Sequence, residues 1–257
     1  MQTRTINGST VAVRRRATRS ALTSWKRWLG AAVSLIVLFA AIVHSVVLIK
    51  IFSYKDKNPT VTSLMEQRAQ EAARAGQPAK RDQIWVPYDR ISPSLVRSVL
   101  AGEDSRFFDH SGFDWDEMQK ALEKDWQDKG FTRGASTISQ QLAKNLFLST
   151  SKNPFRKLHE ALITWELERI LGKRRILELY LNVIEWGDGI YGVEAAAHHY
   201  FDESASALGP DQAAFLSATI PNPRETYNPS THKRRVEHRK ALIQRLMRHV
   251  VVPRDLN

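Results

Sequence analysis

One uninterrupted apolar run near the N-terminus constrains this chain more than any other feature. Residues 28–49 contain no acidic, lysine or arginine side chain, and only His44 and two serines among them are polar. The run is long enough to cross a bilayer, and a helix satisfies its own backbone hydrogen bonds in lipid. A cleaved signal peptide would have a shorter apolar core and a small-residue cleavage site, but Lys50-Ile51-Phe52 follows directly. We therefore predict a retained transmembrane helix over 28–49.

Positive charge is concentrated at the two ends of the chain. Residues 1–27 carry seven basic residues and no acid, residues 231–257 carry eight against two acids, and the net charge is +11. The middle is therefore slightly acidic, which argues against a nucleic-acid partner. The positive-inside rule places the N-terminus in the cytoplasm and the residues after the apolar run outside it. The absence of cysteine excludes disulfides and is compatible with the periplasm.

Helix signals dominate after the apolar run. Ser92-Pro93 and Asn153-Pro154 each place a capping residue before a proline at a first helical position. No run of alternating strands is present, so the predicted fold class is mainly α. The predicted organisation is a basic cytoplasmic tail at 1–27, a transmembrane helix at 28–49, a stalk or linker at 50–82, a folded domain at 83–230 and a basic amphipathic helix at 231–257.

The run from Glu103 to Gly112 has the composition of a cleft. It contains an acidic pair, two aromatic residues, a histidine and a glycine. A solitary glutamate at a helix end is usually a solvated carboxylate. Here Phe107, Phe108 and His110 follow, and aromatic surroundings raise the pKa of a carboxyl group, which suits a general base.

A second polar run covers Arg133 to Gln141 and continues to Lys144-Asn145. Its alternative explanation is a solvated helix face, but such faces usually carry more acids than this one. Amide side chains suit sugar hydroxyls, and a fixed lysine stabilises negative charge that develops on a departing phosphate. Ser136-Thr137 near a helix start adds backbone N–H donors for the same anion.

The third run is Arg156-Lys157-x-x-Glu160. Arg156 and Glu160 are four residues apart on a predicted helix, so an ordinary surface ion pair is the simplest interpretation.

In order and spacing, these runs resemble the peptidoglycan glycosyltransferases, which polymerise lipid II into glycan strands. The resemblance continues through Lys173–Phe201 and Ala213–Pro229 and covers about residues 84–229. Most of these last two stretches are expected to be scaffold, although Glu178, Tyr180 and Asn182 could approach the substrate. There is no room for a transpeptidase domain, so the chain is most similar to the membrane-anchored monofunctional branch. Its domain at 83–230 would then be the peptidoglycan glycosyltransferase domain.

Three positions depart from the pattern of the family. Ala135 stands where many members have a second glycine, and Thr164 replaces a more usual alanine. Lys152 falls where some relatives carry a phosphate-contacting arginine. Each of the three motifs is still recognisable despite the departure within it.

The resemblance implies a lysozyme-like lobe, a small membrane-facing jaw lobe and a defined chemistry. Glu103 would be the base that takes the proton from the 4-hydroxyl of an acceptor GlcNAc, whose oxygen displaces polyprenyl pyrophosphate from C1 of the donor MurNAc with inversion. Glu160 would be a second essential carboxylate near the phosphates. The residues implied in substrate or pyrophosphate binding are Ser136, Thr137, Gln140, Gln141, Lys144, Asn145, Lys152, Arg156 and Lys157. Those implied in supporting the cleft are Asp104, Phe107, His110 and Gly112.

The resemblance also implies partners and a location. These are lipid II, the nascent lipid-linked glycan, the membrane and other cell-wall synthesis proteins, with the chain in the inner membrane and its catalytic domain in the periplasm. No cofactor is required by the sequence. A divalent cation, Mg or Mn, at the pyrophosphate is left open.

Two other functions remain as alternatives. A lysozyme-like muramidase or lytic transglycosylase also uses a catalytic glutamate on the same sugars, but it has no need for phosphate-binding cations. An inactive membrane-anchored scaffold would be indicated by a changed Glu103 or Glu160, and both are present. For the helix at 231–257 we expect packing against the domain with a solvated basic face, and contact with anionic lipid is the alternative.

Overall fold

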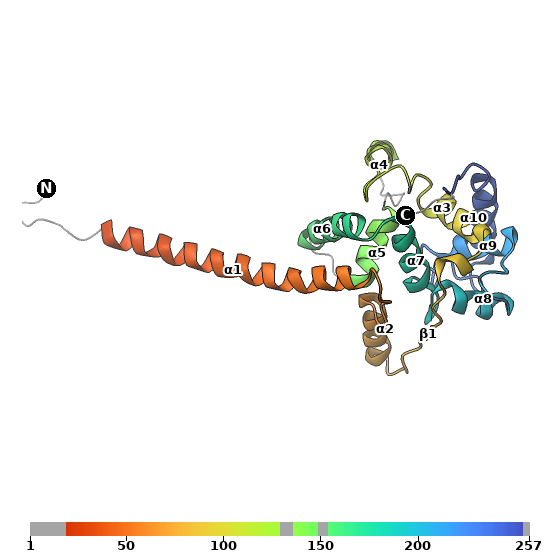
Figure 1. Ribbon diagram of the computed structural model, residues 1–257, viewed down its shortest axis with the longest axis horizontal. Coiled ribbons are helices and arrows are strands. Elements are labelled where there is room, and N and C mark those ends of the chain that lie inside the picture. Colours follow the sequence, from red (N-terminus) through yellow and green to blue (C-terminus); the bar gives the residue numbers. More distant parts are fainter. Residues whose placement is uncertain (1–18, 129–135, 149–153, 254–257) are drawn as a thin grey trace, which may run out of the picture. The chain divides into compact units, whose positions relative to one another are not determined.

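Helices account for most of the fold, which confirms the prediction of a mainly α chain. The computed structural model describes residues 19–128, 136–148 and 154–253 (Figure 1). The helices within these ranges are α1 (Arg19–Ser53), α2 (Ser63–Arg74), α3 (Pro93–Glu103), α4 (Trp115–Asp128), α5 (Ile138–Phe147), α6 (Pro154–Ile170), α7 (Lys173–Val183), α8 (Val193–Phe201), α9 (Pro210–Thr219) and α10 (Lys233–Leu246), with one 3₁₀ turn, η1 (Tyr88–Arg90). The strands are β1 (Asp82–Gln83), β2 (Glu185–Gly187) and β3 (Ile190–Tyr191).

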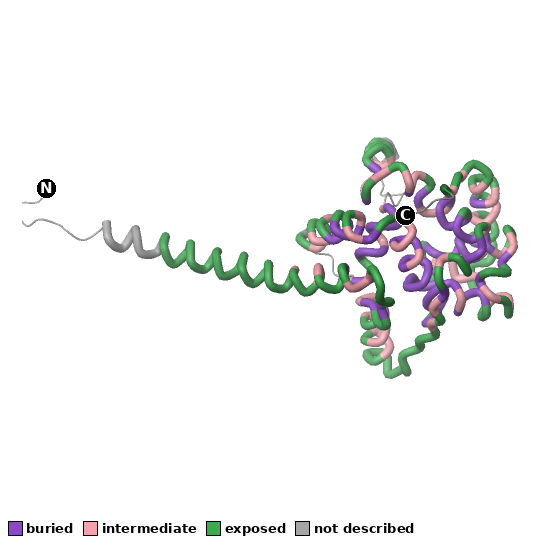
Figure 2. The backbone as a smooth tube through the Cα atoms, viewed as in Figure 1, coloured by how far each residue is buried: buried purple, intermediate pink, exposed green. Residues whose placement is uncertain are grey.

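The N-terminal part of α1, up to Val47, is a unit of its own. The stretch Lys26–Ser53 is long and apolar enough to cross a membrane, and its most apolar window is not buried by other parts of the protein (Figure 2). The Ser45 hydroxyl donates to the Ala41 carbonyl at 2.8 Å, so a polar group of this span is satisfied within the helix. The predicted helix over 28–49 is confirmed, and it is compatible with a membrane anchor.

The second unit, residues 48–257, has α5 in contact with both α6 and α7. Leu142 and Leu177 are completely buried between these helices, and each such side chain stabilises the fold by about 1.5–3 kcal/mol. The Glu168 carboxylate joins all three helices, because it accepts hydrogen bonds from Ser139 at 2.5 Å and from Lys173 at 2.8 Å. This packing gives α5 a fixed position.

A second set of contacts joins α3, α9 and α10. Gly102 permits the close approach of α10, because a Cβ there would lie 3.1 Å from Cδ1 of Ile243. The prediction that the C-terminal helix packs against the domain is therefore confirmed. The buried residues of this cluster are Ala101, Ala214, Ala218, Val236 and Ile243.

The small sheet has the strand order β1-β3-β2, with β1 parallel and β2 antiparallel to β3. Asp82 pairs with Ile190, so the segment before α3 is tied to the hairpin that follows α7. Gly189 has a φ of +77°, and a Cβ there would come within 2.4 Å of Lys80. Only glycine is accommodated at this turn.

The segment predicted as a stalk, 50–82, is part of the second unit and contacts its other elements. Arg175 on α7 donates to the carbonyl oxygens of Tyr54 and Lys57 at 2.7 and 2.8 Å. The Ser63 hydroxyl at the start of α2 donates to the Leu146 carbonyl of α5 at 3.1 Å. As a result, α2 is packed beside α5 and contributes to the wall of the cavity described next.

Candidate active site

Glu103 is the last residue of α3, and its carboxylate lies between two other helices. Oε2 accepts a hydrogen bond from Nε2 of Gln141 on α5 at 2.9 Å, and Oε1 accepts one from Nη2 of Arg239 on α10 at 2.7 Å. Tyr180 on α7 donates its hydroxyl to Oε1 of Gln141 at 2.9 Å, which turns the NH₂ group of that amide toward Glu103. Four helices therefore meet at this carboxylate.

Burial dominates the electrostatics of Glu103. Its side chain is only 8% exposed, and the lost hydration raises the pKa of the carboxyl above its ordinary value. The charge of Arg239, the hydrogen bond from Gln141 and the charge of Lys144 oppose this shift without cancelling it. A carboxylate with a raised pKa is a stronger base, which suits removal of a proton from a hydroxyl group.

Asp104, the next residue, connects the first polar run to the second. It accepts hydrogen bonds from Nε2 of His110 at 3.0 Å and from the backbone N–H of Ile138 at 3.0 Å. The second contact places a carboxylate at the N-terminus of α5, where it also complements the helix dipole. Phe107 is fully buried, with the Lys173 ammonium 4.3 Å from its ring centroid. These contacts connect the first polar run to α5 and to Lys173, and the supporting role of its residues in a substrate cleft stays a prediction.

Thr137 and Gln140 form the N-terminal capping box of α5. The Thr137 hydroxyl oxygen accepts the Gln140 N–H at 3.2 Å, and Oε1 of Gln140 accepts the Thr137 N–H at 3.0 Å. Thr137 also donates to the Gly112 carbonyl at 2.7 Å, and both polar side chains are buried outside the cavity lining. The structure thus assigns them to the fold of α5, because their polar atoms already have protein partners. Toward the described part of the site, Ser136 contributes its carbonyl, which lies 3.5 Å from Nε2 of Gln141.

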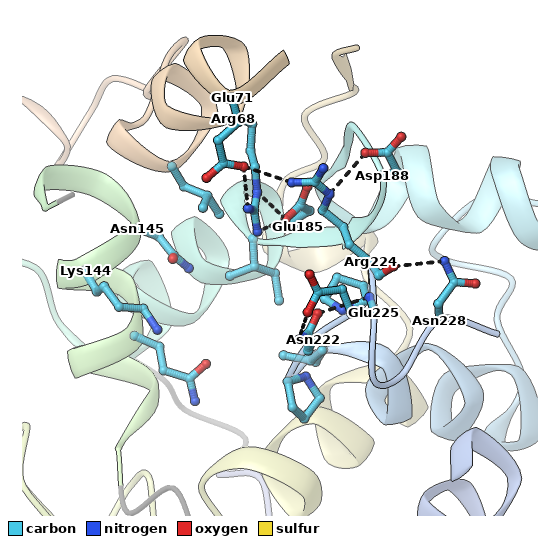
Figure 3. Close-up of a pocket in the computed structure, with 16 residues that line it drawn as sticks. Arg68, Glu71, Lys144, Asn145, Glu185, Asp188, Asn222, Arg224, Glu225 and Asn228 are labelled. Atoms are coloured by element: carbon cyan, nitrogen blue, oxygen red, sulfur yellow. Dashed lines mark hydrogen bonds and ion pairs between the residues drawn. The ribbon is translucent and has the colours of Figure 1, made fainter. Parts of the chain in front are cut away.

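Three other predicted residues, Gln141, Lys144 and Asn145, line a cavity of about 810 Å³. Figure 3 shows Lys144 and Asn145 on α5 at one side of this cavity and Arg224 at the other. Glu103 does not line this cavity itself, but Gln141 lines it and donates to Glu103, so one side chain connects the carboxylate to the cavity lining. The remaining lining residues are Leu64, Arg68, Glu71, Ile184, Glu185, Asp188, Ile220, Pro221, Asn222, Pro223, Glu225 and Asn228.

The far wall of the cavity is a network of ion pairs (Figure 3). Arg68 on α2 binds Glu185 at 2.8 Å, and Arg224 binds Glu71 at 3.1 Å and Asp188 at 3.2 Å. Burial raises the pKa of the Glu185 carboxyl, and the charge of Arg68 opposes that shift. The sequence analysis did not identify these residues, because they come from α2, β2 and the segment after α9.

Glu160 is buried among cations at the start of α6. It accepts a hydrogen bond from Arg156 at 3.0 Å and pairs with Lys157. Lost hydration lowers the pKa of the Lys144 ammonium, and the positive charges of Arg156 and Lys157 lower it further. The negative charges of Glu160 and, more weakly, Glu103 raise this pKa without restoring its ordinary value. Part of the Lys144 side chain is exposed at the cavity wall, while its ammonium loses enough hydration to lower its pKa. Among the described residues, the three cations Lys144, Arg156 and Lys157 accompany Glu160, and Glu103 is already paired with Arg239, so this region favours an anionic ligand.

Some of the residues considered in the sequence analysis do not line the cavity or lie outside the described residues. Lys152 and Ala135 lie outside the described residues. Asn182 binds the backbone of Val86 with both ends of its amide, at 2.8 and 2.9 Å, so it holds the fold. The sequence analysis also missed Arg239, whose contact with Glu103 no local pattern indicates.

Comparisons with known proteins agree with this geometry. The family model described as Transglycosylase matches residues 68–248. The chain belongs to the transglycosylase family. A biosynthetic peptidoglycan transglycosylase of Methylobacillus flagellatus is 50% identical over 198 residues, which is 77% of this chain and 86% of that protein. One from Chromobacterium violaceum is 49% identical over 79% of this chain and 89% of its own length, and one from Aromatoleum aromaticum is 48% identical over 86% and 96%.

The transglycosylase match reaches further than the resemblance seen in the sequence. It begins at Arg68 in α2 and ends at Arg248, beyond α10. Both ends of the match therefore include elements that the structure places at the cavity or at Glu103.

The described residues contain no group of three or more metal-ligating acidic, histidine or cysteine side chains. Both oxygens of Glu160 already face cationic side chains, Arg156 and Lys157. This donor set does not fit a metal ion held by the protein alone.

Proposed function

We propose that this transglycosylase polymerises lipid II into peptidoglycan strands for cell-wall synthesis. The observation that carries the proposal is Glu103: a buried carboxylate, held at each oxygen and joined through Gln141 to a large cavity lined by Lys144. The family and the names of its relatives support glycan polymerisation as the activity.

The proposed reaction transfers the growing glycan to a new lipid II molecule. Glu103 takes the proton from the 4-hydroxyl of the acceptor GlcNAc as that oxygen bonds to C1 of the donor MurNAc. The bond from C1 to the polyprenyl pyrophosphate breaks on the opposite face, so the configuration inverts. Negative charge grows on the leaving pyrophosphate, and the cations Lys144, Arg156 and Lys157 are suited to stabilise it. In this scheme Glu160 orients Arg156 and Lys157.

We place the active unit on the outer side of the bacterial inner membrane. The helix over 26–53 would be a single-pass anchor, with the basic N-terminal tail in the cytoplasm and the residues after the helix in the periplasm. This anchor would tether the folded domain to the membrane that carries lipid II and nascent glycan. Other cell-wall synthesis proteins are further proposed partners.

A cation at the pyrophosphate remains a proposal. Since the protein donors do not fit a metal by themselves, a divalent Mg or Mn ion would have to arrive with the phosphates. No step of the proposed reaction depends on it.

The lytic alternative is less consistent with the site. Glycan cleavage needs a carboxylic acid and a sugar cleft, whereas this cavity wall carries Lys144 beside the Arg156, Lys157 and Glu160 cluster. The three cations on this side are suited to a phosphate-bearing substrate, whereas the far wall carries the acids Glu71, Glu185, Asp188 and Glu225 against Arg68 and Arg224.

The test compares the detergent-solubilised wild type with Glu103→Gln on lipid II. We expect long glycan from the wild type and a loss of at least about 100-fold in rate for the variant, the usual size of a general-base contribution. Circular dichroism would establish that the variant is folded. Cleavage of preformed glycan without polymerisation would support the lytic function instead, and neither activity would support the inactive scaffold.

A further inference from the structure

Arg239 brings a positive charge to Glu103 from a distant part of the chain. Its Nη2 donates to Oε1 of Glu103 at 2.7 Å and to the carbonyl oxygen of Gly102 at 3.0 Å. The guanidinium lies 5.6 Å from the ring centroid of Tyr227. The side chain is only 21% exposed, and its Nε is buried without a hydrogen-bond partner. These contacts hold the guanidinium in one orientation against the carboxylate.

The inward position of Arg239 is set by the packing of α10. Val236 and Ile243, three residues before it and four after it, are both buried against the domain. Other basic residues of the same helix differ: Lys240 binds Asp211 at 2.7 Å, and Arg245 is exposed. Arg239 therefore turns inward beside the buried face of α10 and reaches Glu103, whereas Lys240, which is only 15% exposed, pairs with the exposed Asp211.

We propose that Arg239 is a positioning residue of the reaction, which fixes the orientation of the Glu103 carboxylate and keeps it negatively charged in its buried site. The proposal rests on the proposed function of Glu103 as the base. A buried carboxylate needs a countercharge and hydrogen bonds to remain ionised. Arg239 supplies both at Oε1, while Gln141 occupies one position on Oε2. Each carboxylate oxygen has a second lone pair, so Glu103 can still accept a proton.

The other groups around Glu103 cannot replace this charge. Lys144 contributes the weakest of the effects that lower the pKa of Glu103, and Gln141 is neutral. Burial raises the pKa of Tyr180 well above its ordinary value, so Tyr180 is neutral too. Asp104, the nearest acid along the chain, is itself bound to His110. Removing Arg239 therefore removes the largest opposition to burial, and the pKa of Glu103 rises further.

The test measures lipid II polymerisation against pH for the full-length protein and three variants, Arg239→Gln, Arg239→Lys and the exposed control Arg245→Gln. For Arg239→Gln we expect the acid limb of the rate profile to move to higher pH, so that kcat at a pH on that limb falls about tenfold for each unit by which the limb moves. KM for lipid II should change little. Arg239→Lys should retain the acid limb of the wild type, and Arg245→Gln should behave as wild type.

A second measurement separates this role from folding and from the proposed function. The infrared absorption of the Glu103 carboxyl is obtained by subtracting the Glu103→Gln spectrum. We expect Arg239→Gln to show the protonated band at a pH where the wild type shows the ionised one. If the wild type does not polymerise lipid II, the proposed function fails, but the infrared comparison still tests the link between Arg239 and Glu103. If Arg239→Gln shows the same acid limb and the same carboxyl band as the wild type, the proposal is overturned. A loss of activity that accompanies a lower melting temperature would then indicate a purely structural role.

Discussion

The ionised form of Glu103 is costly in its buried site, and this cost makes stability depend on pH. Burial raises the carboxyl pKa above its ordinary value of 4.5. Below that ordinary value the group is protonated in both the folded and unfolded states, so it has no effect. As pH rises through the folded-state pKa, the unfolded state ionises more easily, and the free energy of unfolding falls by about 1.4 kcal/mol for each unit of the shift.

Glu103→Gln should remove this dependence. We expect the difference in melting temperature, variant minus wild type, to increase as pH rises from about 4 to about 7. A constant offset is acceptable, because differences in packing and neutral hydrogen bonds between glutamine and protonated glutamate do not titrate in this range. Scanning calorimetry of both proteins across pH measures the difference, with the exposed Glu237→Gln as the control. A difference that stays flat with pH would contradict the raised pKa.

The residue types around Glu103 and Lys144 made them candidates, and the resemblance to the family gave each its predicted role. The sequence could not identify Arg239, which is one of eight basic residues in 231–257 and is separated from Glu103 by 136 positions. Nor could it distinguish Gln140 from Gln141. The two residues are adjacent on α5, and the helical rotation between them directs the Gln140 side chain to the capping box and the Gln141 side chain to the cavity.

At the scale of single helices, the capping box makes α5 a sharply defined element. Thr137→Ala removes the acceptor for the Gln140 N–H and the donor to the Gly112 carbonyl. We expect the free energy of unfolding to fall by about 1–2 kcal/mol, the usual cost of losing such a cap. Thermal unfolding measures the change. Ser136→Ala is the matched control, because its hydroxyl has no role in the cap, and an equal loss in both variants would refute the assignment.

Local signals predicted the helices well wherever a cap or proline marked an end. The expected starts at Pro93 and Pro154 coincide with those of α3 and α6. The position of α2 was not predictable in this way. Its polar composition suggested a stalk, whereas Arg68 pairs with Glu185, 117 positions along the chain. Such pairing depends on tertiary packing, which no local sequence window contains.

At the scale of the whole domain, elements from both ends of the matched region complete the site. α2 forms part of the cavity wall, and α10 supplies the arginine that binds Glu103. The domain boundary at residue 230, inferred from the sequence, therefore separates the base from its countercharge. α10 is packed through Val236 and Ile243, so its contribution to the site depends on its contribution to the core.

This dependence gives a prediction for two changes in α10. Ile243→Ala should lower the free energy of unfolding by about 2–4 kcal/mol, because it leaves a cavity beside Ala101 and Ala218. Leu246→Ala, at a position that is 42% exposed, should change it by less than about 1 kcal/mol. Deleting 231–257 should abolish the cooperative unfolding transition seen by circular dichroism, since it removes the whole buried face of the helix. A truncated protein that stays folded but sediments less with anionic liposomes would show instead that α10 serves the membrane surface, and that the core is complete without it.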